Sequence, residues 1–290
     1  MMPRLIDVHT HTQFAAYDSD RDAIIRRALD ARIWMINVGT QKDTSANSCE
    51  LAHRHEGIFA TVGLHPIHTE KSYHDESELG IMKEEDNGGG LPHGFTSRGE
   101  EFDYDYYKKL AHNPKVVAIG ECGLDYYRLT EDTKQKQAEV FIKQIELARD
   151  VKKPLMIHCR NAFSDLIELL TTNCKLLTTP HPGVCHFFTG TIDDAQKLMD
   201  LGFSFSFGGV ITFAREYEKL IKFIPPDRVV LETDAPYVAP QAYRGKRNEP
   251  LYVEEVAKKI SRILNRDFDE VARITTENAI RIFGLNSQSR

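Results

Sequence analysis

Eight short apolar runs, each followed by a longer segment of helical pattern, recur along this chain of 290 residues. They are rich in β-branched and aromatic residues and cover Leu5–Val8, Trp34–Val38, Ile58–Val62, Val116–Ile119, Leu155–Ile157, Gly183–Phe187, Phe203–Phe207 and Val229–Leu231. Strands that alternate with helices are typical of βα units in a parallel sheet. Eight such units predict an α/β fold, a (β/α)8 TIM barrel, whose usual length is about 250 residues. A doubly wound open sheet is the alternative.

The helical segments show the expected apolar period. Within Thr133–Asp150, apolar residues such as Phe141 and Ile145 repeat four apart and form one buried stripe. Two further helices, Tyr252–Leu264 and Phe268–Phe283, are predicted after the eighth strand, and the second ends at Gly284 as helices often do.

One stretch interrupts the alternation. Lys71–Asp103 is rich in Glu, Asp and Gly and contains Gly88–Gly90. We expect a single barrel domain over residues 1–290, with residues 71–103 as an exposed surface insertion between the third strand and its helix. Because it leaves from the carboxyl end of a strand, a lid over that end of the barrel is the alternative.

Composition narrows the class of protein. No apolar stretch reaches the roughly 18 residues needed to cross a bilayer, and Met1–Arg4 leads into a strand without a signal peptide, so we expect a cytoplasmic location and no membrane. The five cysteines lack a Cys-x-x-Cys spacing, which favours buried thiols. A net charge of -6 argues against general coating of nucleic acid and leaves room for a local cationic rim.

Imidazole and carboxylate side chains follow five of the apolar runs. In parallel strands these side chains would meet at one end of the sheet, where they suit a divalent-ion centre. His9 and His11, two apart on a strand, point to the same face and can reach one ion. The predicted metal ligands are His9, His11, Glu121, His158, His186 and Asp234.

Seven motifs resemble those of the TatD family of metal-dependent deoxyribonucleases, within the amidohydrolase-like barrels. They span nearly the whole chain and occur in the family's order: Asp7–His11, Gly63–Pro66, Gly120–Tyr127, His158–Arg160, His186–Gly190, Glu232–Tyr237 and Arg244–Pro250. Two departures are Cys122, where the family usually has an aliphatic residue, and the longer, more acidic stretch Lys71–Asp103.

The resemblance implies a centre of two divalent ions. Glu121 would bridge the ions, His9, His11 and Asp234 would hold one, and His158 and His186 the other. Such a pair activates water and neutralises phosphoryl charge, which implies phosphodiester hydrolysis with Asp234 and Glu121 as catalytic residues. Asp234 would also orient the attacking water. The resemblance and the imidazole-rich set leave the metal open among Mg²⁺, Mn²⁺ and Zn²⁺.

Substrate contacts are predicted around the open side of this centre. His65, Arg160 and, by resemblance, Asp125 are candidates for gripping phosphate, and Tyr126 or Tyr127 for stacking a base. Arg244, Lys246 and Arg247 form the most basic cluster and follow the eighth strand, where they could meet a nucleic-acid backbone. A solvated loop or a structural pair between Arg247 and Glu249 is the alternative.

Three functions fit these features. The first is a metal-dependent exonuclease on single-stranded or damaged DNA, acting as a monomer. The second is a hydrolase of the same fold acting on another bond, such as a D-aminoacyl-tRNA ester, an amide or a small phosphoester. The third, a binding protein with a relict site, requires a missing ligand, and all six are present.

Overall fold

Eight parallel strands close into a barrel in the computed structural model, which describes residues 2–71, 73–74, 95–96, 98–127, 131–173 and 179–285. In chain order the barrel strands are β1 (Leu5–Thr10), β2 (Ile33–Val38), β3 (Ile58–Val62), β6 (Val116–Asp125), β7 (Leu155–Arg160), β8 (Gly183–Cys185), β9 (Ser204–Phe207) and β10 (Val229–Leu231). The barrel closes where β1 pairs with β10, with Asp7 beside Leu231. The predicted (β/α)8 barrel is therefore confirmed, and the open sheet is wrong.

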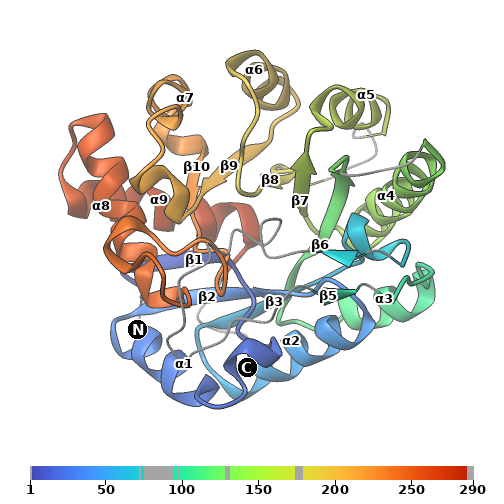
Figure 1. Ribbon diagram of the computed structural model, residues 1–290, viewed down its shortest axis with the longest axis horizontal. Coiled ribbons are helices and arrows are strands. Elements are labelled where there is room, and N and C mark those ends of the chain that lie inside the picture. The colour runs from blue at the N-terminus through green and yellow to red at the C-terminus, as the bar shows by residue number, and fades with distance from the viewer. Residues whose placement is uncertain are drawn as a thin grey trace.

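Helices lie outside the strands, most of them in a ring around the barrel (Figure 1). They are α1 (Arg21–Asp30), α2 (Lys42–Arg54), α3 (Tyr104–Ala111), α4 (Glu131–Val151), α5 (Phe163–Asn173), α6 (Ile192–Asp200), α7 (Tyr217–Phe223), α8 (Val253–Leu264) and α9 (Phe268–Phe283). Short 3-10 turns connect them at η1 (Ala15–Tyr17), η2 (Pro66–His68), η4 (Gly209–Thr212), η5 (Pro226–Arg228), η6 (Gln241–Tyr243) and η7 (Pro250–Tyr252). Helix α9 ends at Gly284, whose φ of 63° is the left-handed cap predicted from the sequence.

Helix α9 covers the amino-terminal end of the barrel. Asn278 donates to the carbonyl oxygen of Val229 at the start of β10, and Thr276 donates to that of Arg4 just before β1. Buried apolar residues of α9, among them Ile282 and Phe283, join a cluster drawn mostly from the strands. The opposite end, where the strands finish, is left for the polar side chains predicted to form the site.

Between β3 and α3 the described residues include a two-stranded antiparallel sheet of β4 (Tyr73–His74) and β5 (Phe95–Thr96). It lies within the predicted insertion. Residues 72, 75–94 and 97 fall outside the described part of the chain, so the lid remains a prediction.

Candidate metal centre

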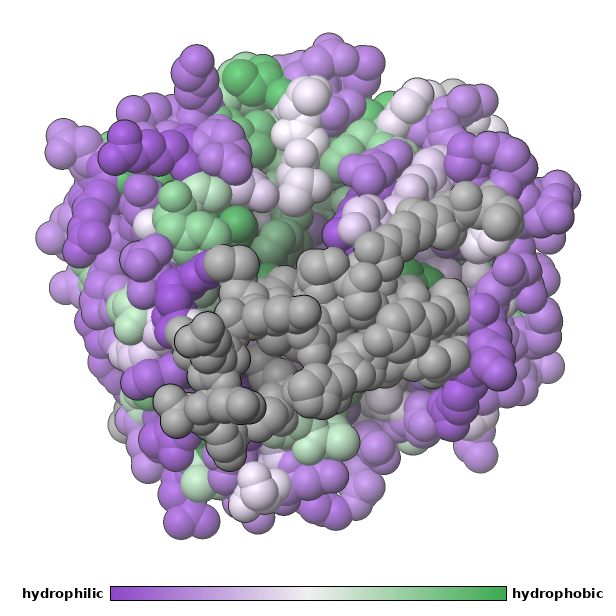
Figure 2. All heavy atoms as spheres, in the orientation of Figure 1, coloured by the Kyte–Doolittle hydropathy of each residue, from purple (hydrophilic) through white to green (hydrophobic). Residues whose placement is uncertain are grey.

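The six predicted ligands converge at the carboxyl ends of the strands. His9 lies on β1 and His11 directly follows it, Glu121 lies on β6 and His158 on β7, and His186 and Asp234 follow β8 and β10. In Figure 2 the face seen in Figure 1 is hollowed near its middle, inside the ring of helices. Asp234 and His158, each with 18% of its side chain exposed, are the most open of the six.

A first group surrounds one point with four ligand atoms. Nε2 of His9 lies 3.2 Å from Nε2 of His11, 3.4 Å from Oε2 of Glu121 and 3.7 Å from Oδ1 of Asp234. Nε2 of His11 lies 3.4 Å from the same Asp234 oxygen and 3.9 Å from the same Glu121 oxygen. Ligands about 2.1 Å from a tetrahedral cation stand about 3.4 Å apart, so the spacing fits a divalent ion.

A second group shares the other oxygen of the same glutamate. Oε1 of Glu121 lies 2.8 Å from Nε2 of His186 and 3.1 Å from Nδ1 of His158, and these two nitrogens are 3.2 Å apart. Three ligand atoms here against four in the first group would leave coordination positions for water or substrate. Glu121 thus offers one oxygen to each group, as a bridging ligand must.

Electrostatics keep Glu121 ready to bind cations. Burial alone would raise the pKa of this carboxyl, but the facing imidazoles of His65, His186 and His9 outweigh it and hold the pKa well below the ordinary value. Asp234 behaves in the same way: burial opposes ionisation, and His11 and His9 still lower the pKa of the carboxyl. Both carboxylates are therefore ionised at neutral pH.

Hydrogen bonds to the outer nitrogens fix the tautomers of two histidines. Nδ1 of His11 lies 2.8 Å from the carbonyl oxygen of Val38, which can only accept, so this nitrogen carries the proton and Nε2 keeps a lone pair. Nε2 of His158 lies 3.0 Å from Oδ2 of Asp125, so His158 keeps its lone pair on Nδ1, the atom that faces Glu121. Each ring presents a lone pair to the centre, as a ligand requires.

His65 also faces the centre, in the opposite tautomer. Its Nδ1 accepts the backbone N–H of Ile67 at 3.1 Å, so in the neutral ring Nε2 carries the proton. That Nε2 lies 3.2 Å from Oε1 of Glu121. Burial lowers the pKa of His65 to about 4, so the ring is neutral at pH 7. His65 therefore presents a hydrogen-bond donor to the site, which agrees with a substrate contact better than with a metal ligand.

Asp125, predicted as a substrate contact, is buried and engaged with the protein. Its Oδ2 faces His158, and its Oδ1 accepts the backbone N–H of Tyr127 at 2.9 Å. Burial raises and His158 lowers the pKa of Asp125, and the lowering prevails. Both carboxylate oxygens of Asp125 therefore contact the protein, one of them the ring of His158, and the predicted contact with substrate stays a prediction.

Two buried glutamines of α4 hold the segments that carry these groups. The side-chain amide of Gln144 bonds to Leu64 in both directions, accepting its N–H and donating to its carbonyl oxygen, each at 2.9 Å. Gln137 does the same for Asp125, at 2.8 and 3.0 Å. The residue before His65 and the end of β6 are thereby fixed to one helix. Neither glutamine was predicted from the sequence.

The ends of β1 and β10 are joined behind the first group. Asp7 accepts the hydroxyl and the backbone N–H of Thr233, and also the backbone N–H of His9. The register of β1 against β2 shifts between Asp7 and Thr10, the stretch that contains His9. Asp234 takes a positive φ of 54° and donates its N–H to the carbonyl oxygen of His9. These contacts hold Asp234 beside the two histidines.

Two arginines on the rim lie over aromatic rings. The guanidinium of Arg160, on β7, stands 3.8 Å from the ring centre of Tyr127, and that of Arg244 stands 4.2 Å from the ring centre of Phe213. Phe213 is 37% exposed. The turns beneath it are tied together, since Thr212 accepts the N–H of Gln241 at 2.7 Å. Phe213 was not singled out from the sequence.

The other two predicted substrate contacts, Lys246 and Arg247, have different surroundings. Lys246 is exposed. Arg247 donates to Asp20 and to the carbonyl oxygen of Ala16, both at 2.6 Å, and lies over the ring of Tyr17. The structural pair expected with Glu249 is thus made with Asp20 instead. These bonds join η1 to the loop after β10, and they direct Arg247 toward the protein rather than toward a ligand.

Tyr126 is likewise engaged, since its hydroxyl donates to Asp165 at 2.8 Å and its ring packs on the core. The described cysteines, Cys49, Cys122, Cys159 and Cys185, are buried, as expected.

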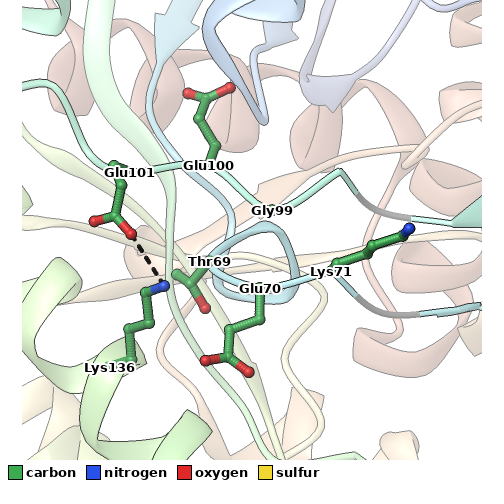
Figure 3. Close-up of a pocket in the computed structure, with 7 residues that line it drawn as sticks. All are labelled: Thr69, Glu70, Lys71, Gly99, Glu100, Glu101 and Lys136. Carbon is green, nitrogen blue, oxygen red and sulfur yellow. Dashed lines mark ion pairs between the residues drawn. The ribbon is translucent and has the colours of Figure 1, made fainter.

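A separate cavity of about 440 Å³ lies at the root of the insertion. It is lined by Thr69, Glu70, Lys71, Gly99, Glu100, Glu101 and Lys136, and Lys136 pairs with Glu101 at 3.2 Å (Figure 3). None of the six predicted ligands lines it.

Comparison with known proteins agrees with the geometry. The family described as TatD related DNase matches residues 6–284. The chain belongs to the TatD family. It is 36% identical to the metal-dependent hydrolase YabD of Bacillus subtilis, over 97% of this chain and all of that protein. It is 32% identical to the 3'-5' ssDNA/RNA exonuclease TatD of Cronobacter sakazakii, over 98% of this chain and 99% of that one.

A solved TatD homologue from Escherichia coli, YJJV, superposes with a TM-score of 0.80 at 26% identity, covering 99% of this chain and all of that one. This TatD-family chain is therefore a metal-dependent hydrolase, and the predictions of family and enzyme class are confirmed. Over the described residues, no helix is both long and apolar enough to span a membrane.

Proposed function

We propose that this TatD-family hydrolase removes nucleotides from single-stranded DNA with two divalent cations held by the six ligands. One observation carries the proposal: the two oxygens of Glu121 belong to two separate groups of ligand atoms that meet at this carboxylate. When bound, two such cations supply Lewis acidity to a water and to a phosphoryl oxygen. The name of the Cronobacter sakazakii relative supports a nucleic-acid substrate.

The chain's own residues would then divide the work. Asp234, ionised and partly open, accepts a proton from the attacking water. The Nε2–H of His65 donates a hydrogen bond to a phosphoryl oxygen as negative charge grows there. Arg160 and the exposed Lys246 attract backbone phosphates, and Arg244 does so while stacked on Phe213. Asp125 acts through His158.

The exposed ring of Phe213 favours a single strand. Stacking on an aromatic face requires an unpaired base, and each stacked base contributes about 1 to 3 kcal/mol. The ring belongs to the loop after β9, and its guanidinium partner to the loop after β10, so both stand at the end of the barrel that holds the ligands.

The test compares substrates and one matched pair of variants. End-labelled single-stranded DNA, double-stranded DNA, RNA and D-aminoacyl-tRNA are incubated with the protein and Mg²⁺, Mn²⁺ or Zn²⁺. We expect a ladder from one end of single-stranded DNA, almost abolished in Asp234→Asn and retained in Asp22→Asn, which alters an exposed carboxylate on α1. Release of amino acid alone would replace the nuclease by an esterase, and full activity of Asp234→Asn would refute the role of that residue.

A further inference from the structure

A buried carboxylate lies behind the proposed centre. Glu232 follows β10 directly, and none of its surface is exposed. Its Oε2 accepts the hydroxyl of Ser206, on the neighbouring strand β9. Its Oε1 is buried and has no hydrogen-bond partner among the described residues. A carboxylate oxygen left without a donor in the core costs several kcal/mol, so a donor for it is expected nearby.

Two donors of the right kind are close. His9 and His186 direct Nε2 toward Glu121, at 3.4 and 2.8 Å, and their rings stack with centres 3.8 Å apart. Nδ1 of each ring is buried and, within the described part of the chain, has no hydrogen-bond partner. His9, His186 and Glu232 each offer an atom to one group whose members lie within 4.8 Å of one another.

The tautomers of the two histidines decide which bonds this group can make. A neutral histidine that gives the lone pair of Nε2 to a cation must carry its proton on Nδ1. His9 and His186 would then each bring an N–H donor to the group that holds the Glu232 carboxylate, which suits hydrogen bonding rather than a further cation. Nδ1 of His186 is 3.7 Å from Oε2 of Glu232. A shift of about 0.9 Å would bring this pair to an ordinary charge-assisted hydrogen bond of about 2.8 Å.

The other two imidazole ligands already have their acceptors. His11 donates to the carbonyl oxygen of Val38, and His158 donates to Asp125. We propose that Glu232 is a shared positioning residue, whose carboxylate accepts the Nδ1 protons of His9 and His186. It would hold one ligand of each cation in the correct tautomer and raise the basicity of both rings. A single residue would then set the affinity of both ions.

The inference rests on the proposed ligand set, and its test is binding of Mn²⁺ measured by calorimetry, without nucleic acid. In Glu232→Gln the negative charge is lost and one of the two accepting oxygens becomes an NH₂ group, which cannot accept a hydrogen bond from an imidazole. We expect both cation affinities to fall about tenfold or more. Asp125→Ala is the matched comparison, because Asp125 orients only His158, and it should weaken one of the two ions.

The titration distinguishes failure of the ligand set from failure of the role of Glu232. If the wild-type protein binds no more than one Mn²⁺, the ligand set fails. If it binds two and Glu232→Gln leaves either affinity unchanged, the shared role of Glu232 is wrong and the ligand set stands. Nitrogen NMR of the histidines in the loaded protein adds a direct readout: we expect Nδ1–H tautomers for His9 and His186, and loss of that pure state in Glu232→Gln.

If Glu232→Gln does not fold, a second variant still tests the proposal. Ser206→Ala keeps the carboxylate and removes its anchor, so we expect both affinities to fall together by a smaller factor. Unchanged affinities in folded Ser206→Ala, together with a different tautomer in the wild type, would overturn the proposal.

Discussion

Nδ1 of His65 lies 3.1 Å from the backbone nitrogen of Ile67 and accepts a hydrogen bond from its N–H. This one contact separates His65 from the ligand histidines, although its Nε2 is 3.2 Å from Glu121, about as close as Nδ1 of His158 at 3.1 Å. The backbone N–H can only donate, so the neutral ring presents a proton rather than a lone pair.

Replacement of His65 should therefore lower turnover but leave the affinity for metal almost unchanged. We expect His65→Ala to reduce kcat by about 100-fold, the usual effect of losing one donor to a developing oxyanion, while Mn²⁺ affinity stays within a factor of about three. His11→Ala, which removes a lone pair, should lose the first cation. Metal content and kcat measured on both variants make the comparison, and parallel loss of metal in the two would make His65 a ligand.

Metal loading should release protons near neutral pH. Burial alone would lower the pKa of His158 and of His186, but carboxylate neighbours outweigh it, Asp125 and Glu121 for His158 and chiefly Glu121 for His186, and both pKa values are raised. The metal-free rings thus tend to hold protons that a cation must displace. Affinity should rise as pH increases through those raised pKa values and then level off. Calorimetry in buffers of different ionisation enthalpy checks the sign, and uptake of protons would contradict it.

Loss of the Phe213 ring should weaken binding of single strands. We expect Phe213→Ala to raise KM for single-stranded DNA by about tenfold, equivalent to roughly 1.4 kcal/mol of stacking, with little change in kcat for a small phosphodiester that has no base. Phe223→Ala is the control, since Phe223 is similarly exposed, at 39%, on α7. Equal KM changes in the two variants would remove the stacking role.

Loss of the Gln144 amide should destabilise the fold and loosen His65. Gln144→Leu leaves both polar groups of Leu64 unpaired in the core, so we expect a loss of about 2 to 4 kcal/mol in the free energy of unfolding. Gln135→Leu, on the exposed side of the same helix, should change it by less than about 0.5 kcal/mol. Urea unfolding of the metal-free proteins measures both, and similar stabilities would show that Leu64 finds other partners.

Much of the architecture could be predicted because each strand is an apolar run and each predicted ligand follows one. Periodicity also indicated the buried stripe of α4, yet Gln137 and Gln144 were missed although they lie on it, seven residues apart. Amides are usually read as surface residues, and only their position among buried neighbours such as Phe141 reveals a core role.

The roles of the charged residues at the rim were harder to predict from the sequence, because their partners are distant along the chain. Sequence shows that Arg247 is basic but not that Asp20, from the other end of the chain, lies 2.6 Å away. The same holds for Asp125, whose partner His158 is on the next strand. Long-range pairing decides whether a charge meets a ligand or the protein, and exposure of a ring such as Phe213 is equally a property of the folded surface.

The barrel is completed by joining its first strand to its last, and the proposed first cation takes His9 and His11 from one and Asp234 from just beyond the other. A chain still emerging from the ribosome has the two histidines but no aspartate to oppose them. Binding of the proposed first cation would therefore wait until synthesis is almost complete, and that ion would then hold the first and last strands together. Copies that end before Asp234 would lack one ligand of this cation and so the hydrolysis that depends on it. Removal of the ion should weaken the junction of the first and last strands first.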